Sequence, residues 1–412
     1  MTGGRRKRGF RCALALYLAL LLLAGAWPAG AQQEPVKIGA LFALSGDVGL
    51  LGEPLRQAVT LAVSHVNEQG GILGGRTLGL VIADDRTDPA TGVAEARRLV
   101  EVEGIAALVG PDTSGVALAV AAEVSVPNRV VTVTLATSPR VASLDDDDYV
   151  FRTAVSDALQ GRVLAGLAAR LGFTRLATLH VDNPYGQDLA ATFASSFAAS
   201  GGTVTESLPF EPGQASYRPL LERAAAGGAQ ALLLIAYPES GLTILNEAIA
   251  GGYFRRFFFS DGMQDPSVIE AVGAPLEGAW GTGPSSAETR GSRVIRQMYE
   301  QLYGPLESAA YFYEAYDAAF LVALAIEKAG EVSGPAIRAA MRELSAANGV
   351  PVLPGEWAKA VELIRAGVPI RYEGAAFTSG FDPAGDLSQG LIGIWTVFDG
   401  KLRTVATERI GE

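Results

Sequence analysis

Short apolar runs alternate with amphipathic helical segments along most of this chain, and this alternation restricts its fold more than any other feature. The first run, residues 37–44, ends at Ser45-Gly46 and has the length of a buried parallel strand. Apolar residues then recur at helical spacing from Leu55 to Val66. Further strands are expected at residues 78–83, 105–109 and 130–134, with a helix from Asp88 to about Val102. The pattern predicts an α/β fold with a doubly wound parallel sheet.

The alternation restarts after Phe151-Arg152-Thr153, which predicts a second lobe of similar architecture. A helix is expected over residues 157–171, with strands at residues 175–180, 203–208, 231–235 and 257–259. The remaining segments are too few for a third domain, so we expect them to complete the two lobes: helices at 309–329, 334–344 and 356–366, and strands at 390–398 and 402–407. Lobe 1 is expected to contain residues 36–153 and 285–389, and lobe 2 residues 154–284 and 390–408.

Residues 1–31 have the three parts of a signal peptide. A basic start is followed by an apolar run over residues 13–26 and by Ala29-Gly30-Ala31, which predicts cleavage before Gln32. An uncleaved anchor fits less well, because the run is shorter than the roughly 20 residues of a membrane span. The sequence leaves open export by the general or the twin-arginine route. The only cysteine, Cys12, lies in this segment, so we expect an exported protein without disulfides.

The charge balance argues against several classes of partner. Beyond residue 31 the chain has 28 lysines and arginines against 44 aspartates and glutamates. Proteins that bind nucleic acids or anionic membranes carry the opposite sign. We therefore expect neither partner.

Polar loops follow the predicted strands, at the positions where ligands bind in open α/β sheets. The loops of the first lobe are rich in hydroxyl groups and helix-start amides, which suit an anionic group. Those of the second lobe supply tyrosines and an acid, which suit an ammonium and an apolar body. Caps and turns use the same residue types, so each loop alone has a structural explanation. The loops cover residues 45–49, 110–115, 135–139, 182–186, 237–239 and 260–262.

Several fragments occur in an order and spacing that resemble one family, the leucine/isoleucine/valine-binding type of periplasmic protein. The resemblance extends from about Val36 to the end of the chain. Its fragments are Ile38-Gly39 to Ser45-Gly46, Asn67 to Gly75, Asp84-Asp85 with Asp88-Pro89, Gly110 to Ser114, Ala136 to Pro139, Phe151 to Thr153, Tyr185-Gly186, Tyr372 to Gly374 and Phe381-Asp382.

The resemblance implies two lobes joined by three chain crossings, with the ligand enclosed between them. In members that bind amino acids, the positions matching Ser114 and Thr137 hold the α-carboxylate. The carbonyl at Leu135 and the acid at Asp261 hold the ammonium. Tyr185 covers the ligand, and Tyr237 lies close to it. Two departures concern the ligand: Asp261 stands where glutamate is common, and Leu51 replaces an aromatic wall found in some members.

We expect a binding protein rather than an enzyme. A dinucleotide fingerprint, a phosphate-binding loop and a nucleophile elbow are all missing from the sequence. His65 and His180 are expected to be structural, and neither a metal nor a cofactor is predicted. The resemblance implies capture of an amino acid, with a branched or other aliphatic side chain, for a membrane ABC permease. A monomer is the simplest expectation. A sensor or receptor for amides or for short-chain or aromatic carboxylic acids remains the alternative.

Overall fold

The computed structural model describes residues 33–285, 289–306, 310–345, 347–377 and 380–410. The predicted signal peptide, residues 1–31, and Cys12 within it lie outside these residues. Val36–Glu412 forms one compact unit. Among the described helices, none has the length and apolar character needed to cross a membrane.

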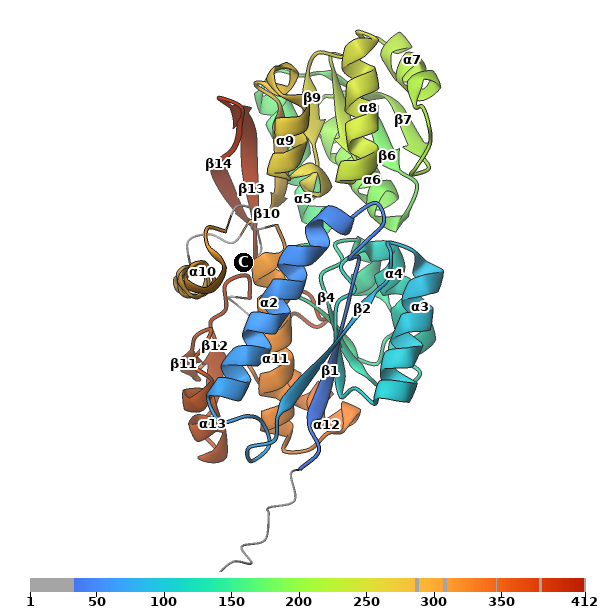
Figure 1. Ribbon diagram of the computed structural model, residues 1–412. Helices are drawn as coiled ribbons and strands as arrows, with labels where there is room; N and C mark the ends of the chain where they lie inside the picture. The colour runs from blue at the N-terminus through green and yellow to red at the C-terminus, as the bar shows by residue number, and fades with distance from the viewer. Residues whose placement is uncertain (1–32, 286–288, 307–309, 346, 378–379, 411–412) are drawn as a thin grey trace, which may run out of the picture. The chain divides into compact units, whose positions relative to one another are not determined.

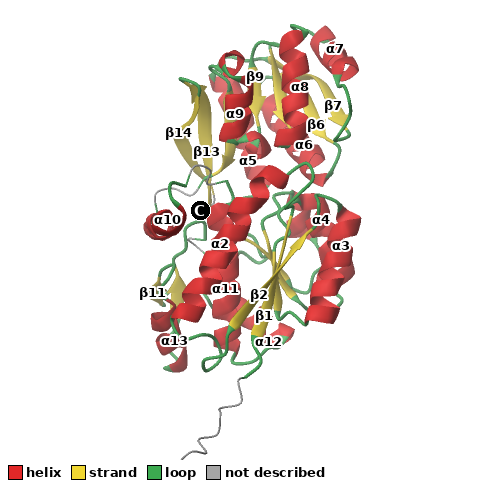
Figure 2. Ribbon diagram, in the orientation of Figure 1, coloured by secondary structure: helices red, strands yellow, loops and turns green. Residues whose placement is uncertain are grey.

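The first sheet contains five parallel strands in the order β2-β1-β3-β4-β5. Figures 1 and 2 show β1 and β2 of this sheet. Successive residues of a strand point to opposite faces, which places Ala107 and Val109 in one apolar cluster and Leu108 in another. The sheet is therefore buried on both faces, as the sequence predicts. Its strands are β1 (Val36–Phe42), β2 (Leu78–Asp84), β3 (Ala107–Val109), β4 (Val131–Thr134) and β5 (Val150–Arg152).

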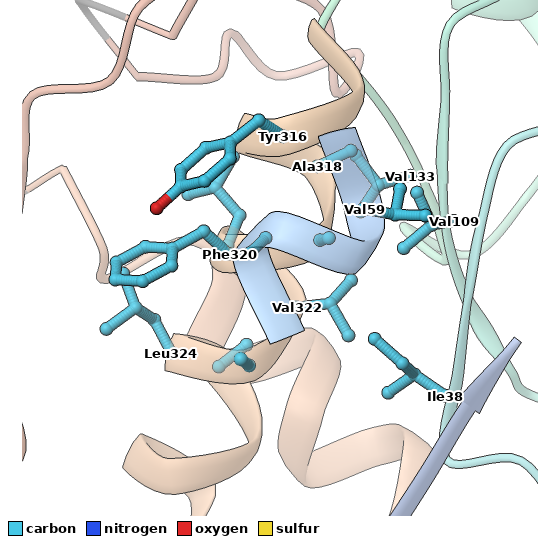
Figure 3. Close-up of a cluster of buried hydrophobic side chains, with 14 of the residues drawn as sticks. Ile38, Val59, Val109, Val133, Tyr316, Ala318, Phe320, Val322 and Leu324 are labelled. Atoms are coloured by element: carbon cyan, nitrogen blue, oxygen red, sulfur yellow. The ribbon is translucent and has the colours of Figure 1, made fainter. Parts of the chain in front are cut away.

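Helices from distant parts of the chain cover this sheet. On one face α2 (Gly49–Glu68) and α12 (Gly334–Met341) pack with α11 (Phe312–Ala329), as Figure 3 shows for part of the cluster. The other face is covered by α3 (Pro89–Arg97) and α4 (Ser114–Val120). Every residue of α11 from Phe312 to Glu327 is buried, because helices and sheet surround it. Each buried leucine or isoleucine there contributes roughly 1.5–3 kcal/mol.

The second sheet has the strand order β14-β13-β10-β9-β8-β6-β7. Strands β6 to β10 are mutually parallel, whereas β13 and β14 form an antiparallel pair at one edge. Its strands are β6 (Arg175–Val181), β7 (Thr203–Phe210), β8 (Ala231–Ile235), β9 (Phe257–Phe259), β10 (Trp280–Pro284), β13 (Gly390–Phe398) and β14 (Lys401–Ile410). Its helices are α5 (Asp157–Arg170), α6 (Pro184–Ala199), α7 (Arg218–Ala226), α8 (Pro238–Ala250) and α9 (Pro266–Val272).

The chain crosses between the two sheets three times: between β5 and α5, between β10 and α10 (Arg290–Tyr303), and before β13. A small parallel pair, β11 (Val350–Val352) with β12 (Ile370–Tyr372), and α13 (Trp357–Arg365) lie in the segment before the third crossing. The predicted class is confirmed: two doubly wound lobes with three crossings. We use lobe 1 for the first sheet with its helices and lobe 2 for the second.

Buried charged side chains bind the segment that precedes the third crossing. The side chain of Arg152 is fully buried, forms an ion pair with Asp386 from the third crossing, and donates to the carbonyls of Ala136 and Ser138 at 3.2 and 2.9 Å. In α11, Asp317 accepts hydrogen bonds from the Tyr372 hydroxyl and from backbone amides of the same later segment. A buried charge is tolerated when it is paired and hydrogen-bonded in this way.

Candidate functional site

A cavity lies at the carboxyl ends of strands from both lobes, and five of the six residues predicted from the sequence line it. Its volume, about 30 Å³, is enough for a water molecule or two but not for an amino acid. Entry of a larger ligand therefore requires the lining to move apart. The lining consists of Val48, Leu51, Leu55, Asp112, Thr113, Ser114, Thr137, Tyr185, Tyr237, Asp261, Gly262 and Tyr311.

Lobe 1 contributes hydroxyl groups from two neighbouring loops. Ser114 is the first residue of α4, after β3, and its hydroxyl accepts a hydrogen bond from the Ser138 amide at 3.1 Å. Thr137 follows β4, and its carbonyl accepts from the Asp157 amide at 2.8 Å. The hydroxyl of Thr113 is buried and has no partner among the described residues. Leu135 is the one predicted residue outside the lining; it is buried beneath the loop.

Lobe 2 contributes a carboxylate surrounded by hydrogen-bond donors. Asp261 accepts from the amide of Gln160 at 2.9 Å, from the hydroxyl of Tyr185 at 2.8 Å and from the hydroxyl of Tyr311. The rings of Tyr185 and Tyr237 stack with their centroids 5.3 Å apart. Tyr311 precedes α11, so its hydrogen bond reaches Asp261 from lobe 1. The sequence gives no indication of this role, because Tyr311 lies in an apolar stretch predicted as helix.

Burial is the largest influence on the pKa values of the acids in this wall. It raises the pKa of Asp261 even though three side chains donate to the carboxylate. Nearby Asp157 is also fully buried, and neither of its side-chain oxygens has a hydrogen bond of normal geometry among the described residues. Burial and the charge of Asp261 raise the pKa of Asp157 well above its usual range, and the Thr137 hydroxyl offsets only part of this. The site thus concentrates acidic groups, which favours a ligand with a cationic part.

Two polar contacts join the lobes at the sides of the cavity. Asp47, after β1, accepts from the amide and hydroxyl of Ser240 at 3.0 and 2.6 Å. On the other side, Asp188 of α6 accepts from the Ser138 hydroxyl at 2.5 Å and from the Arg140 guanidinium at 2.8 and 3.1 Å. We call this second contact the Asp188 clasp. Both contacts hold the lobes together around the cavity.

Larger cavities also occur among the described residues, with volumes of about 160, 560, 370 and 270 Å³. Ser285 and Glu314 line the first two, and none of the six predicted residues lines any of the four. Size alone would favour these cavities as ligand sites. We place the site in the smaller one, because the strand-end loops of both sheets meet there.

A model of the periplasmic binding protein family matches residues 35–362. The chain belongs to the periplasmic binding protein family. The resemblance to the leucine/isoleucine/valine-binding type, predicted from the sequence, is confirmed, because proteins of that type are among its relatives. The family consists of substrate-binding proteins rather than enzymes. Among the described residues of this periplasmic binding protein, no group of three or more histidines, cysteines or acids is placed to hold a metal.

Its relatives include proteins with different biological settings. The chain is 28% identical over 350 residues to the chemotactic signal transduction system substrate-binding protein BasB of Halobacterium salinarum, covering 83% of this chain and 82% of the relative. It is 27% identical to the leucine-, isoleucine-, valine-, threonine-, and alanine-binding protein of Pseudomonas aeruginosa, with coverage of 80% and 88%. A leucine binding protein from Thermotoga maritima shares its fold, with a TM-score of 0.77, 24% identity and coverage of 90% and 98%.

Proposed function

We propose that this protein captures an amino acid with an aliphatic body between its two lobes outside the cytoplasmic membrane. The observation that carries the proposal is the convergence of hydroxyl groups from lobe 1 and a carboxylate with two tyrosines from lobe 2 on one cavity. Ser114 and Thr137 would bind the α-carboxylate. Asp261 and the Leu135 carbonyl would bind the ammonium.

The remaining roles follow from position. Tyr185 and Tyr237 would cover the ligand from lobe 2, while Leu51 and its neighbours on α2 would contact the aliphatic part. Capture would proceed by opening at the three crossings, entry of the ligand and closure. Affinity in the micromolar range, about −8 kcal/mol, needs only a few charge-assisted hydrogen bonds and apolar burial. We also propose that the lobes meet where the sequence predicts: between residues 153 and 154, between 284 and 285, and between 389 and 390.

Delivery to a membrane ABC permease is the proposed next step, by a monomer exported with the signal peptide of residues 1–31. A permease would recognise the closed pair of lobes. The relative from Halobacterium salinarum supports a second candidate, because its name places it in a chemotactic signalling system. In that case the closed form would be recognised by a signalling receptor, and the ligand site would be the same.

A thermal-shift panel tests the ligand class. We expect aliphatic amino acids to raise the melting temperature of the purified protein, because a ligand that binds only the native state stabilises it. The panel should include the deaminated acids, amides and aromatic carboxylic acids as alternatives. A shift with acids or amides but not with any amino acid would contradict the ammonium role of Asp261 while leaving a binding protein.

A further inference from the structure

Asp112 is a second acid of the cavity, and the proposed amino-acid contacts leave it without a function. It follows β3 in lobe 1 and lines the same cavity as Ser114 and Asp261. Its Oδ1 atom accepts a hydrogen bond from the Ala43 amide at 3.0 Å. Among the described residues, no other residue donates to this carboxylate.

The two acids of the cavity differ in the hydrogen bonds that the protein donates to their carboxylates. Three side chains donate to Asp261, whereas Asp112 accepts only from backbone amides, those of Ala43 and of Asp112 itself. Another acid behind the cavity, Asp84, accepts from the amides of Leu44 and Ser45 and from the Ser45 hydroxyl. Asp112 is thus an acid of the cavity lining to which no side chain of the described residues donates. A buried carboxylate of this kind is costly unless a partner arrives.

The charge around the cavity shows what that partner must be. The described residues of the lining include Asp112 and Asp261 but no lysine, arginine or histidine. An amino acid with an uncharged side chain has one positive and one negative group. Its single ammonium cannot neutralise the charges of both Asp112 and Asp261. Its α-carboxylate at Ser114 would also lie close to Asp112, which is only two residues away. A ligand with a second positive group removes this conflict.

Of the two neighbouring acids Asp112 and Asp85, Asp85 holds a proton more readily. Burial raises the pKa of Asp112 to about 6. Burial together with the charge of Asp112 raises the pKa of Asp85 to about 8. Asp112, which lines the cavity, is thus the member of the pair that more readily carries a negative charge toward a ligand.

We infer that Asp112 binds a cationic group at the end of the ligand side chain, so that the ligand is a basic amino acid such as ornithine or lysine. Val48, Leu51 and Leu55 of the same wall provide apolar contact for the methylene stem between the two charged ends. This inference rests on the proposed function and narrows it, from an amino acid with an aliphatic body to one whose aliphatic stem ends in a cation.

Titration calorimetry at pH 7.5 with lysine, ornithine and norleucine tests the inference. Norleucine has the stem of lysine without its terminal ammonium. We expect the purified protein to bind lysine or ornithine about tenfold or more tightly than norleucine, because a charged hydrogen bond is lost with norleucine. This comparison needs no variant, so it holds even if a substitution disturbs folding.

The variant Asp112→Asn should lower the preference for the basic ligand by about tenfold or more and change norleucine affinity by less than about threefold. Asp399→Asn, at an exposed position in the turn between β13 and β14, is the matched control and should change neither affinity. Tighter binding of norleucine or leucine by the unaltered protein would overturn the inference alone, as would equal losses for both ligands in Asp112→Asn. Failure of every amino acid to bind would overturn the proposed function as well.

Discussion

The lobe 2 wall of the cavity holds its carboxylate with protein donors, whereas the lobe 1 wall leaves polar atoms for a ligand. Asp261 is already hydrogen-bonded by Gln160, Tyr185 and Tyr311. On the lobe 1 wall the Thr113 hydroxyl is buried without a partner among the described residues, and Asp112 accepts only from backbone amides. A charged group that the protein already holds in place binds one end of a ligand. Polar groups without protein partners then determine which groups the rest of the ligand must carry. The two walls should therefore respond differently to substitution.

The largest effect is expected from Asp261→Ala on the lobe 2 wall. Loss of the carboxylate removes the partner of the ligand ammonium and the acceptor of the Tyr311 hydroxyl, whereas the Tyr185 hydroxyl keeps its contact with the Ser260 hydroxyl at 2.7 Å. We expect amino-acid affinity to fall by about a hundredfold, from charged hydrogen bonds worth roughly 1.5–3 kcal/mol each. Titration calorimetry measures this, with Asp399→Asn as the control. Unchanged affinity would remove the ammonium role from Asp261.

On the lobe 1 wall, loss of one hydroxyl should have a smaller effect. Thr137, which lines the cavity, becomes an equally shaped residue without a hydroxyl in Thr137→Val, and the contact of that hydroxyl with Asp157 is lost as well. We expect affinity to fall by roughly tenfold, because neighbouring hydroxyls and amides still contact the carboxylate. The corresponding carboxamide of the ligand should lose little in the same variant. An equal loss for the acid and the amide would contradict a carboxylate site on this wall.

A substitution outside the cavity separates ligand contact from closure. Asp188→Asn weakens the Asp188 clasp, which touches no proposed ligand group. The pair is only partly buried, with the Arg140 side chain 49% exposed, so salt screens it. We expect roughly threefold faster release of ligand, measured by stopped-flow fluorescence, and a smaller difference at high salt. Faster capture together with unchanged release would argue against a role in holding the closed form.

The smallest expected effect is on the stability of the ligand-free protein. Burial and the charge of Asp261 hold the pKa of Asp157 well above its unfolded value, so the folded state binds an extra proton between the two values. Stability therefore decreases as pH rises through that window. Asp157→Asn removes this loss of stability. Between pH 5 and pH 8, the melting temperature of the variant should therefore fall by roughly 2 °C less than that of the unaltered protein. Parallel melting curves for the two proteins would contradict the shifted pKa.

Much of the fold could be predicted because buried parallel strands are apolar and short. The glycine-rich strand β10 was missed for a physical reason. A Cβ atom on Gly281 would lie 2.1 Å from the Trp395 ring, so packing across the sheet, not strand propensity, selects glycine there. The helix predicted from residue 309 begins at Phe312, because Tyr311 adopts a left-handed backbone conformation with φ 56°.

In the site, too, some residues could be predicted from the local sequence, whereas the roles of others depend on contacts between distant segments. Ser114, Thr137, Tyr185, Tyr237 and Asp261 could be predicted from loops that follow strands and from the family resemblance, and the structure brings them to one cavity. The roles of Tyr311 and Asp112 depend on contacts between distant segments. Asp112 lies in a loop whose residues equally suit a turn, and no local pattern indicates that its carboxylate faces a ligand.

The most direct test of the enclosed-ligand proposal is a crystal structure with the amino acid that gives the largest thermal shift. We expect its carboxylate at Ser114 and Thr137 and its ammonium within about 3 Å of Asp261, the distance of a charged hydrogen bond. A ligand bound instead in one of the larger cavities lined by Ser285 and Glu314 would contradict the proposal.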